Sequence, residues 1–263
     1  MGVEPIMSDS KITEELFFDK SEMNSASVQK LLSNTLRHTD DGELFFEYEQ
    51  SESFVFDDGV LRSANFDTNQ GFGLRAIHDQ TIAYAHSSEL TEKAIKRAAT
   101  TVNSVKSGHE GTNNDEIAKT NQKLYCEDNP LDSIPFSKKV KVLENIDKFV
   151  RDLDNRVKQV TASLAGSWQA VRIMRANGSE ASDIRPLVRL NISCVVGDNN
   201  KMESGSYGAG GRETYENFLT DDFWEGAARE AYRQAVVNLD SNATPAGEMP
   251  VVLGPGWPAI LLH

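Results

Sequence analysis

Apolar and polar residues in the first third of the chain follow helical spacing and then strand spacing. From Val28 to Leu36 the apolar residues recur three or four positions apart, which predicts one amphipathic helix. Residues 44–48 alternate between apolar and polar, as in a half-buried strand. A second apolar run at 54–56 ends in Asp57-Asp58-Gly59, a sequence typical of a tight turn, so we expect a hairpin here.

A second hairpin and a closing helix complete this first unit. Strands are predicted at 71–77 and 82–85, with the bend at residues 78–80. The apolar residues of 94–102 then share one face of a helix, and Ser88 is a candidate cap for its start. The unit therefore consists of a helix, two hairpins and a helix.

The same order of spacings returns in the second half of the chain. Ser137 is a good cap for a helix whose apolar face spans 143–153. Strands are predicted at 157–164 and 168–175, and Asn177-Gly178 then supplies a strong hairpin turn signal. These elements match the first helix and first hairpin of the earlier unit.

A second hairpin and a helix also close this unit. Residues 188–196 alternate strictly between apolar and polar, and a polar turn leads into a further strand at 201–208. A helix with its apolar face over 224–239 follows, with its cap predicted at Asp221 or Asp222.

Both units thus predict an α+β fold built from a duplicated helix–hairpin–hairpin–helix unit, with matching elements offset by roughly 110 to 130 residues. Hairpins grouped with helices indicate an antiparallel sheet covered on one face. The side chains of the two units barely agree, so the alternative is coincidence within a generic α+β chain. The predicted organisation is a disordered tail (1–13), an α+β domain (14–240) made of two units (14–106 and 137–240) with a polar linker between them, and the start of a further domain (241–263).

The sheet faces follow from the alternation. Leu44, Phe46 and Tyr48 of the first unit should pack against helices, and so should their counterparts in the second unit, Leu190, Ile192 and Cys194.

Charge and cysteine content limit the class of protein. The chain has 27 Lys and Arg against 40 Asp and Glu, and its net charge is −13. Surfaces that bind nucleic acid collect positive charge, whereas the basic clusters here, around Lys93 and around Lys138, Lys139 and Lys141, are predicted on exposed helix faces. We therefore expect no nucleic-acid partner. Cys126 and Cys194 show no motif spacing and are expected to be free thiols.

Targeting signals are equally sparse. No apolar run is long enough to cross a membrane, so no membrane association is predicted. The first ten residues are acidic and small rather than basic and apolar, which does not fit a secretory signal. The expected location is the cytoplasm.

No combination of residues within positions 1–240 predicts a catalytic site. The glycine-rich segment from Ser204 to Arg212 matches neither nucleotide-binding fingerprint. One interpretation makes Arg212 a binding residue for a substrate carboxylate. The other makes it a surface arginine at a bulged hairpin end.

The last residues differ from the rest of the chain. Val251–Gly254 is a short apolar strand, and Pro255–Pro258 is a turn that places a proline at a plausible first helical position. Residues 259–263 then begin an apolar helix that ends in His263. We expect the chain to be the front part of a longer protein whose next helix starts here.

These residues resemble the TldD/PmbA family of intracellular metallopeptidases, earlier labelled modulators of DNA gyrase. The segment Val251–His263 is similar to the part of that family that leads into its HExxxH metal motif. Phe54–Leu61, Gln70–Ala76 and Gly210–Arg212 are also similar to family sequences, and the resemblance extends from about Glu14 onward. The presence of His263 favours the TldD-like branch.

The resemblance implies a function and one metal ligand. His263 matches the first histidine of the motif, while the glutamate expected as general base and the remaining ligands lie beyond the chain. The family implies Zn²⁺ as cofactor, a peptide or unfolded protein as substrate, and a PmbA-like paralogue as the partner in a heterodimer.

The chain as given is expected to be inactive, because one histidine cannot supply the three protein ligands of a catalytic zinc site. The alternative to an enzyme is a non-catalytic partner subunit or peptide-binding module on the same scaffold. A glutamate directly after His263, and a second histidine four positions after that glutamate, would distinguish the enzyme from the binding module.

Overall fold

A computed structural model describes residues 9–21, 23–103, 125–198, 201–243, 245–254, 260 and 263, and it confirms the α+β class. The helices and strands run in the order α1 (Asp9–Glu14), a π-helical turn η1 (Glu15–Asp19), α2 (Ser25–Thr35), β1 (Asp41–Asp57), β2 (Val60–His78), β3 (Thr81–Ser87), α3 (Glu92–Val102), α4 (Pro130–Ser133), α5 (Phe136–Leu153), β4 (Val157–Arg175), β5 (Glu180–Gly197), β6 (Met202–Gly211) and α6 (Asp221–Leu239).

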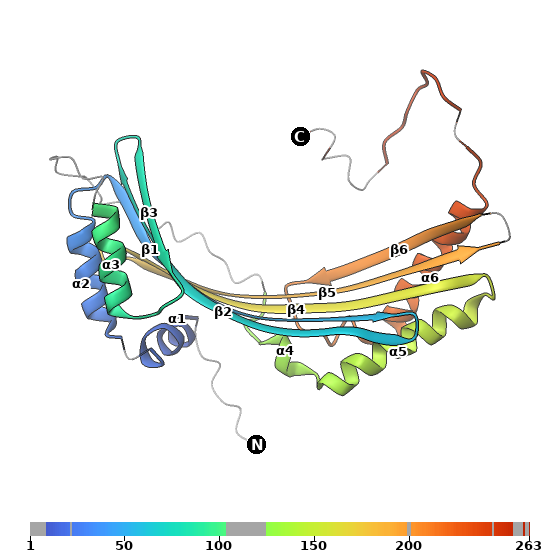
Figure 1. Cartoon of the computed structure of the whole chain (residues 1–263), viewed down its shortest axis with the longest axis horizontal. Coiled ribbons are helices and arrows are strands. Elements are labelled where there is room, and N and C mark those ends of the chain that lie inside the picture. Colours follow the sequence, from blue (N-terminus) through green and yellow to red (C-terminus); the bar gives the residue numbers. More distant parts are fainter. Residues whose placement is uncertain are drawn as a thin grey trace.

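The six strands form one antiparallel sheet in the order β3-β2-β1-β4-β5-β6. The two units therefore meet at their first strands, with Gln50 of β1 opposite Trp168 of β4 near the centre of the pair. From either edge of the sheet, the third, second and first strands of a unit follow in that order, and the two first strands run antiparallel. The helices of the two units consequently lie at opposite ends of the long, curved sheet (Figure 1).

Each unit has the predicted order of a helix, two hairpins and a helix, but its two hairpins share their middle strand. The segments 44–48 and 54–56 belong to the single strand β1, and 157–164 and 168–175 belong to the single strand β4. The sequence suggested breaks because polar residues interrupt the apolar alternation in β1, and because Gly166 and its small neighbours resemble a turn.

The predicted turns are confirmed where the structure describes them. Asp58 and Gly59 join β1 to β2 with φ of 52° and 79°, and Gly178 joins β4 to β5 with φ of 86°. Asp79, at the bend between β2 and β3, has φ of 53°. Such left-handed residues match the twist of the flanking strands, so these turns fix the register of the hairpins.

One face of the sheet carries both hydrophobic cores. On β1 the even-numbered residues are buried at both ends, so Leu44 and Phe46 lie under α2 and α3 while Phe54 and Phe56 lie under α5. Leu190, Ile192 and Cys194 of β5 are buried in the second core, as predicted, and Tyr48 packs against the first.

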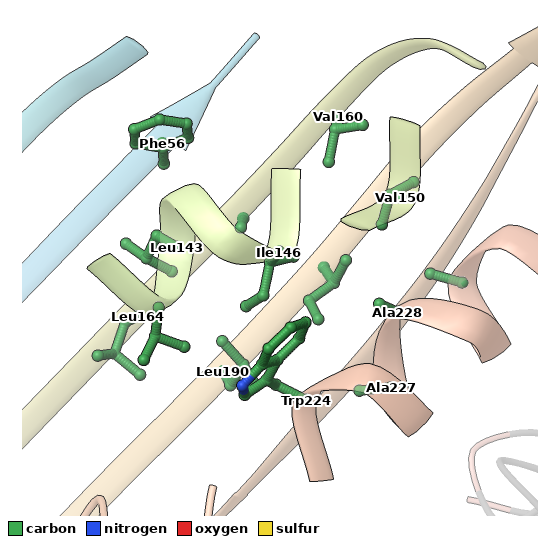
Figure 2. Close-up of a cluster of buried hydrophobic side chains, with 14 of the residues drawn as sticks. Phe56, Leu143, Ile146, Val150, Val160, Leu164, Leu190, Trp224, Ala227 and Ala228 are labelled. Carbon is green, nitrogen blue, oxygen red and sulfur yellow. The ribbon is translucent and has the colours of Figure 1, made fainter. Parts of the chain in front are cut away.

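Figure 2 shows the second core, where Leu143 and Ile146 of α5 and Trp224 of α6 point toward Leu164 and Leu190 of the sheet. The apolar face of each helix lies against the apolar face of the sheet, which every second residue of a strand forms. Burial of this kind stabilises by roughly 25 cal/mol per Å² of apolar surface.

The helix caps differ from the predicted ones. Thr91 caps α3 instead of Ser88, because Leu90 enters the first core before the helix begins. Pro135 precedes α5, and Thr220 precedes α6, so the predicted caps Ser137 and Asp221 or Asp222 lie inside these helices.

The predicted tail (1–13) is partly helical. Residues 9–14 form α1, Ile12 packs against the first core, and the Thr13 hydroxyl hydrogen-bonds with that of Ser182 at 2.9 Å. Residues 1–8 and the polar stretch 107–121 of the predicted linker lie outside the described residues, whereas the end of the linker contains the short helix α4. None of the described helices is both long and apolar enough to cross a membrane.

Candidate functional site

The predicted metal ligand lies at the end of the chain. His263 is exposed, as is Ile260, while the rest of the predicted helix start falls in residues 255–259 and 261–262, outside the described residues. The segment 245–254 rises above the sheet in Figure 1, on the side away from α5. Within the described ranges no three His, Cys, Asp or Glu side chains are placed to hold a metal ion. The described residues therefore do not form a metal centre.

Arg212 follows β6 directly and is exposed. Its guanidinium carbon lies 5.3 Å from the centre of the Tyr125 ring. The Tyr125 hydroxyl donates hydrogen bonds to the carboxylate of Asp183 at 3.0 and 3.2 Å, and Arg185 donates to the same carboxylate at 2.7 Å. Desolvation, followed by the bond to Asp183, raises the pKa of Tyr125.

This geometry bears on the two interpretations of Arg212. Asp183 is already bound by Arg185 and Tyr125, and no ion pair joins Arg212 to a carboxylate in the described part of the chain. The guanidinium of Arg212 lies over an aromatic ring, and the residue is exposed. Such a group is suited to bind a carboxylate that arrives from outside.

Sequence reasoning missed a buried ion pair at the centre of the sheet. Lys139 was expected on an exposed helix face, but only 2% of its side chain is exposed, and its Nζ donates to Oε1 of Glu52 at 2.5 Å. Nζ also donates to the Leu131 carbonyl oxygen at 2.8 Å and lies 4.7 Å from the centre of the Tyr215 ring. We call Glu52, Lys139 and Tyr215 the central polar cluster.

The central polar cluster joins the two units, because Glu52 belongs to β1 and Lys139 to α5. Burial raises the pKa of the Tyr215 phenol far above its ordinary value, and the negative charge of Glu52 adds to the shift. Tyr215 packs directly on Gly166 of β4, where an added Cβ would lie 2.1 Å from the phenol oxygen. The buried cluster therefore connects β1 of the first unit to α5 of the second.

The face of the sheet opposite the helices is polar. A shallow hollow of about 360 Å³ lies at its middle, lined by side chains that include Ser51, Asn65, Asp67, Ser167 and Arg189. Ala165 and Leu187 also line the hollow, and its residues include no pair arranged as nucleophile and base.

Comparison with known proteins decides the family. Residues 42–102 match the model of PmbA/TldA metallopeptidase domain 1, and residues 129–239 match the model of the PmbA/TldA metallopeptidase central domain. A metalloprotease TldD homolog from Haemophilus influenzae is 38% identical over 86% of the chain. The chain belongs to the PmbA/TldD metallopeptidase family. The two matched ranges fall one in each unit, on either side of residues 104–124.

Other relatives agree with this assignment. A metalloprotease TldD homolog from Buchnera aphidicola (subspecies Schizaphis graminum) is 32% identical over 96% of the chain. The chain spans about half the length of these relatives, 48% and 54% respectively.

Solved structures share the fold. A Thermotoga maritima protein labelled as a modulator of a DNA gyrase superposes on 89% of the chain with a TM-score of 0.66 at 17% identity, and the match covers 50% of that protein. TldE from Thermococcus kodakarensis superposes on 80% with a TM-score of 0.63 at 16% identity, covering 47% of TldE.

Proposed function

We propose that the full-length protein is a zinc-dependent metallopeptidase of the cytoplasm that cuts peptides or unfolded polypeptides, and that this chain is its N-terminal scaffold. The observation that carries the proposal is the 38% identity, over 86% of the chain, to a relative named a metalloprotease. A peptidase must hold its substrate extended, and a long sheet with exposed polar edges is suited to that task.

His263 is proposed as one metal ligand. A catalytic zinc site takes three protein ligands and keeps one position open for water. The remaining ligands and the general base, which the family resemblance implies, are proposed to lie in the part of the full-length protein that follows His263. The role of the sheet is then to present substrate to a site that the other half of the protein completes.

The matching experiment measures zinc content and peptide cleavage side by side for the full-length protein, its His263→Ala variant and the 263-residue chain. We expect zinc and cleavage in the full-length protein only. His38→Ala is the control, because His38 is also exposed but lies in the turn after α2, far from the chain end. Stoichiometric zinc or cleavage in the 263-residue chain would place the metal site elsewhere. Zinc-free, inactive full-length protein that still binds peptide would favour the non-catalytic module.

Arg212 is proposed to bind a carboxylate of the substrate. Arg212→Ala in the full-length protein should raise the KM for peptides with a free C-terminal carboxylate and leave kcat within about threefold, since only ground-state binding is lost. Arg229→Ala is a matched control, because Arg229 lies over the Phe149 ring at 4.7 Å but is also paired with Glu225. Equal effects on amidated peptides would contradict a carboxylate role.

A PmbA-like paralogue is proposed as the partner. TldE, whose structure shares this fold, supports the existence of related chains that could pair with it. Sizing the full-length protein alone and mixed with its paralogue, at micromolar concentration, tests the heterodimer. Two unshifted peaks would contradict it.

A further inference from the structure

Within the part of the chain that the structure describes, half of strand β2 has no neighbouring strand on its outer side. β3 pairs only with Phe72–His78, so β2 from Val60 to Gly71 borders the sheet (Figure 1). A bulge opposite Val55 and Phe56 disturbs its first residues, but Ala64–Gln70 is regular and every one of its residues is exposed. On such an edge, alternate residues direct their N–H and C=O groups outward, unpaired.

The equivalent edge in the second unit is covered. β6 leaves Glu180–Leu187 of β5 unpaired, yet only the two end residues of that stretch are exposed. Thr13 of α1 contacts Ser182, and Tyr125 binds Asp183. The fold thus closes one of two symmetric edges with its own chain.

The regular part of the open edge carries little of the usual protection against pairing. Edge strands commonly carry charged residues, especially lysine, or proline; Arg62 lies at the bulge, and the regular part Ala64–Gln70 contains no lysine or proline and one charged residue, Asp67. It presents an aromatic pair instead: Phe66 is 60% exposed and Phe136 of α5 is 46% exposed. Both rings rest on buried Phe54, with centroids 5.4 Å from it and 6.2 Å from each other. An apolar side chain from an added strand would meet these rings on the helix-bearing face.

The opposite face of the same edge is polar. Asn65 and Asp67 point toward the hollow on the open face of the sheet, and Asp67 forms no ion pair with a described residue. A strand that added here would therefore place apolar residues beside Phe66 and polar or basic residues beside Asp67, in alternation.

The length of the edge is limited. At Gly71 the chain of β3 closes it, because an added Cβ would lie 2.7 Å from the Ser87 carbonyl oxygen. At the other end the bulge and the turn at Gly59 interrupt it. Ala64–Gln70 at about 3.4 Å per residue gives room for an extended segment of about 24 Å.

We propose that this edge binds an extended peptide of alternating apolar and polar residues, by strand addition to Ala64–Gln70 with an apolar side chain on Phe66 and Phe136. Unpaired backbone groups at strand spacing are complementary to another extended backbone, and the short, bounded slot fits a peptide segment. The proposal names a substrate class and rests on the proposed function for the choice of a peptide as occupant.

The test measures binding, separately from cleavage. The probe is a fluorescent nine-residue peptide, capped at both ends, with phenylalanine or valine alternating with threonine or lysine, titrated into the 263-residue chain and into the full-length protein with metal removed. Phe66→Ser should weaken binding about tenfold, from the loss of roughly 1–2 kcal/mol of apolar contact. Tyr84→Ser is the control, because Tyr84 is also 60% exposed but lies on β3.

Backbone pairing has its own signature. Two versions of the probe carry N-methyl groups on alternate residues, one on the odd and one on the even positions. Strand addition requires that one version lose binding about tenfold or more while the other retains it, because only every second N–H faces the edge. Equal binding of both versions, or equal effects of Phe66→Ser and Tyr84→Ser, would overturn the proposal.

The outcomes separate this proposal from the proposed function. Full-length protein that cuts peptides but shows no dependence on Phe66 would reject the edge and keep the enzyme. Binding to the 263-residue chain but not to the full-length protein would also reject it, because the edge would then be covered by the remainder of the protein.

Discussion

Phenylalanine rings fill the core of the first unit, whereas alanine and glycine bring helix and sheet close together in the second. Phe46 of β1 stacks on Phe17 at 5.4 Å and meets Phe18 edge-on at 5.6 Å. In the second unit α6 lies so close to β6 that a Cβ on Gly205 would be 2.1 Å from the Ala231 carbonyl oxygen. The same order of helices and strands is therefore compatible with very different core packing. The alternation of apolar and polar residues and the positions of the turns define that order.

The two cores are also not independent. The first core includes Trp168, Met174 and Ile184, which belong to strands of the second unit, and the second core includes Phe54 and Phe56 of β1. Each unit thus needs strands of the other to complete its core. We expect a single cooperative unfolding transition for the described sheet.

The strongest test of this coupling is Lys139→Met. The substitution leaves Glu52 buried without its partner, which costs about 3–5 kcal/mol. The double variant Glu52→Leu with Lys139→Met should recover most of that loss, because no buried charge remains. Urea unfolding followed by fluorescence and by circular dichroism measures both. Two separate transitions in the single variant would show that the units can unfold independently.

Gly205→Val tests the close packing that distinguishes the second unit. The new side chain would collide with the backbone of Ala231 and Ala235, which cannot move without shifting α6. We expect a loss of about 3 kcal/mol in the free energy of unfolding. Gly226→Ala on the exposed side of α6 is the control and should stabilise slightly, since nothing lies within 4 Å of its added Cβ. An unchanged urea midpoint for Gly205→Val would refute the contact.

Acid should weaken the second unit through Asp154. Hydrogen bonds from Arg156 and Tyr232 hold the pKa of this carboxyl well below its ordinary value. A lowered folded pKa means that the stabilisation is complete above pH ~4 and is lost as pH falls further, toward the folded pKa. Asp154→Asn should therefore cost about 1 kcal/mol at pH 7, because Arg156 is partly in solvent, and progressively less below pH ~4. A deficit that grows in acid would contradict the assignment.

The smallest expected effects come from substitutions in the matching turns of the two units, between β1 and β2 and between β4 and β5. Gly59 and Gly178 both have left-handed φ, and nothing lies within 4 Å of an added Cβ at either position. Alanine at either position should lower the free energy of unfolding by about 1 kcal/mol through backbone strain alone, so the two losses should be equal. Thermal unfolding of the two variants measures the difference. Unequal losses would show that one of the turns is not held by its hairpin.

Much of the architecture was predictable because it depends on local patterns. The turns at Gly59 and Gly178, the strand faces of Leu44 and Leu190, and the order of elements all follow from spacing that neighbouring residues reveal. The length of the strands was not predictable. Gln50 and Glu52 put polar residues on the covered face of β1, and only their tertiary partners explain them: Asn129 donates to Gln50, and Lys139 pairs with Glu52.

The candidate sites also combine features that the sequence reveals with contacts that only the structure shows. Arg212 was visible as an arginine after a glycine-rich strand, but its support by Tyr125 joins residues far apart in sequence. The open edge of β2 could not be predicted either. The pattern of apolar and polar residues does not reveal which half of a strand is left unpaired by its neighbour. His263 was found through the family resemblance of the segment around it and not through spacing.

The pairing of β1 with β4 also determines when the protein can fold during its synthesis. Contacts along this pair join residues 104 to 134 positions apart, such as Asp57 with Thr161 and Asp41 with Arg175. At roughly 5–20 residues per second, translation of that interval takes on the order of 5–25 s. During that time β1 has emerged from the ribosome but its partner strand β4 has not. One edge of β1 is then unpaired, and the core of the first unit is incomplete. Slower translation lengthens the exposure, and a chaperone that shields β1 should raise the yield of folded protein.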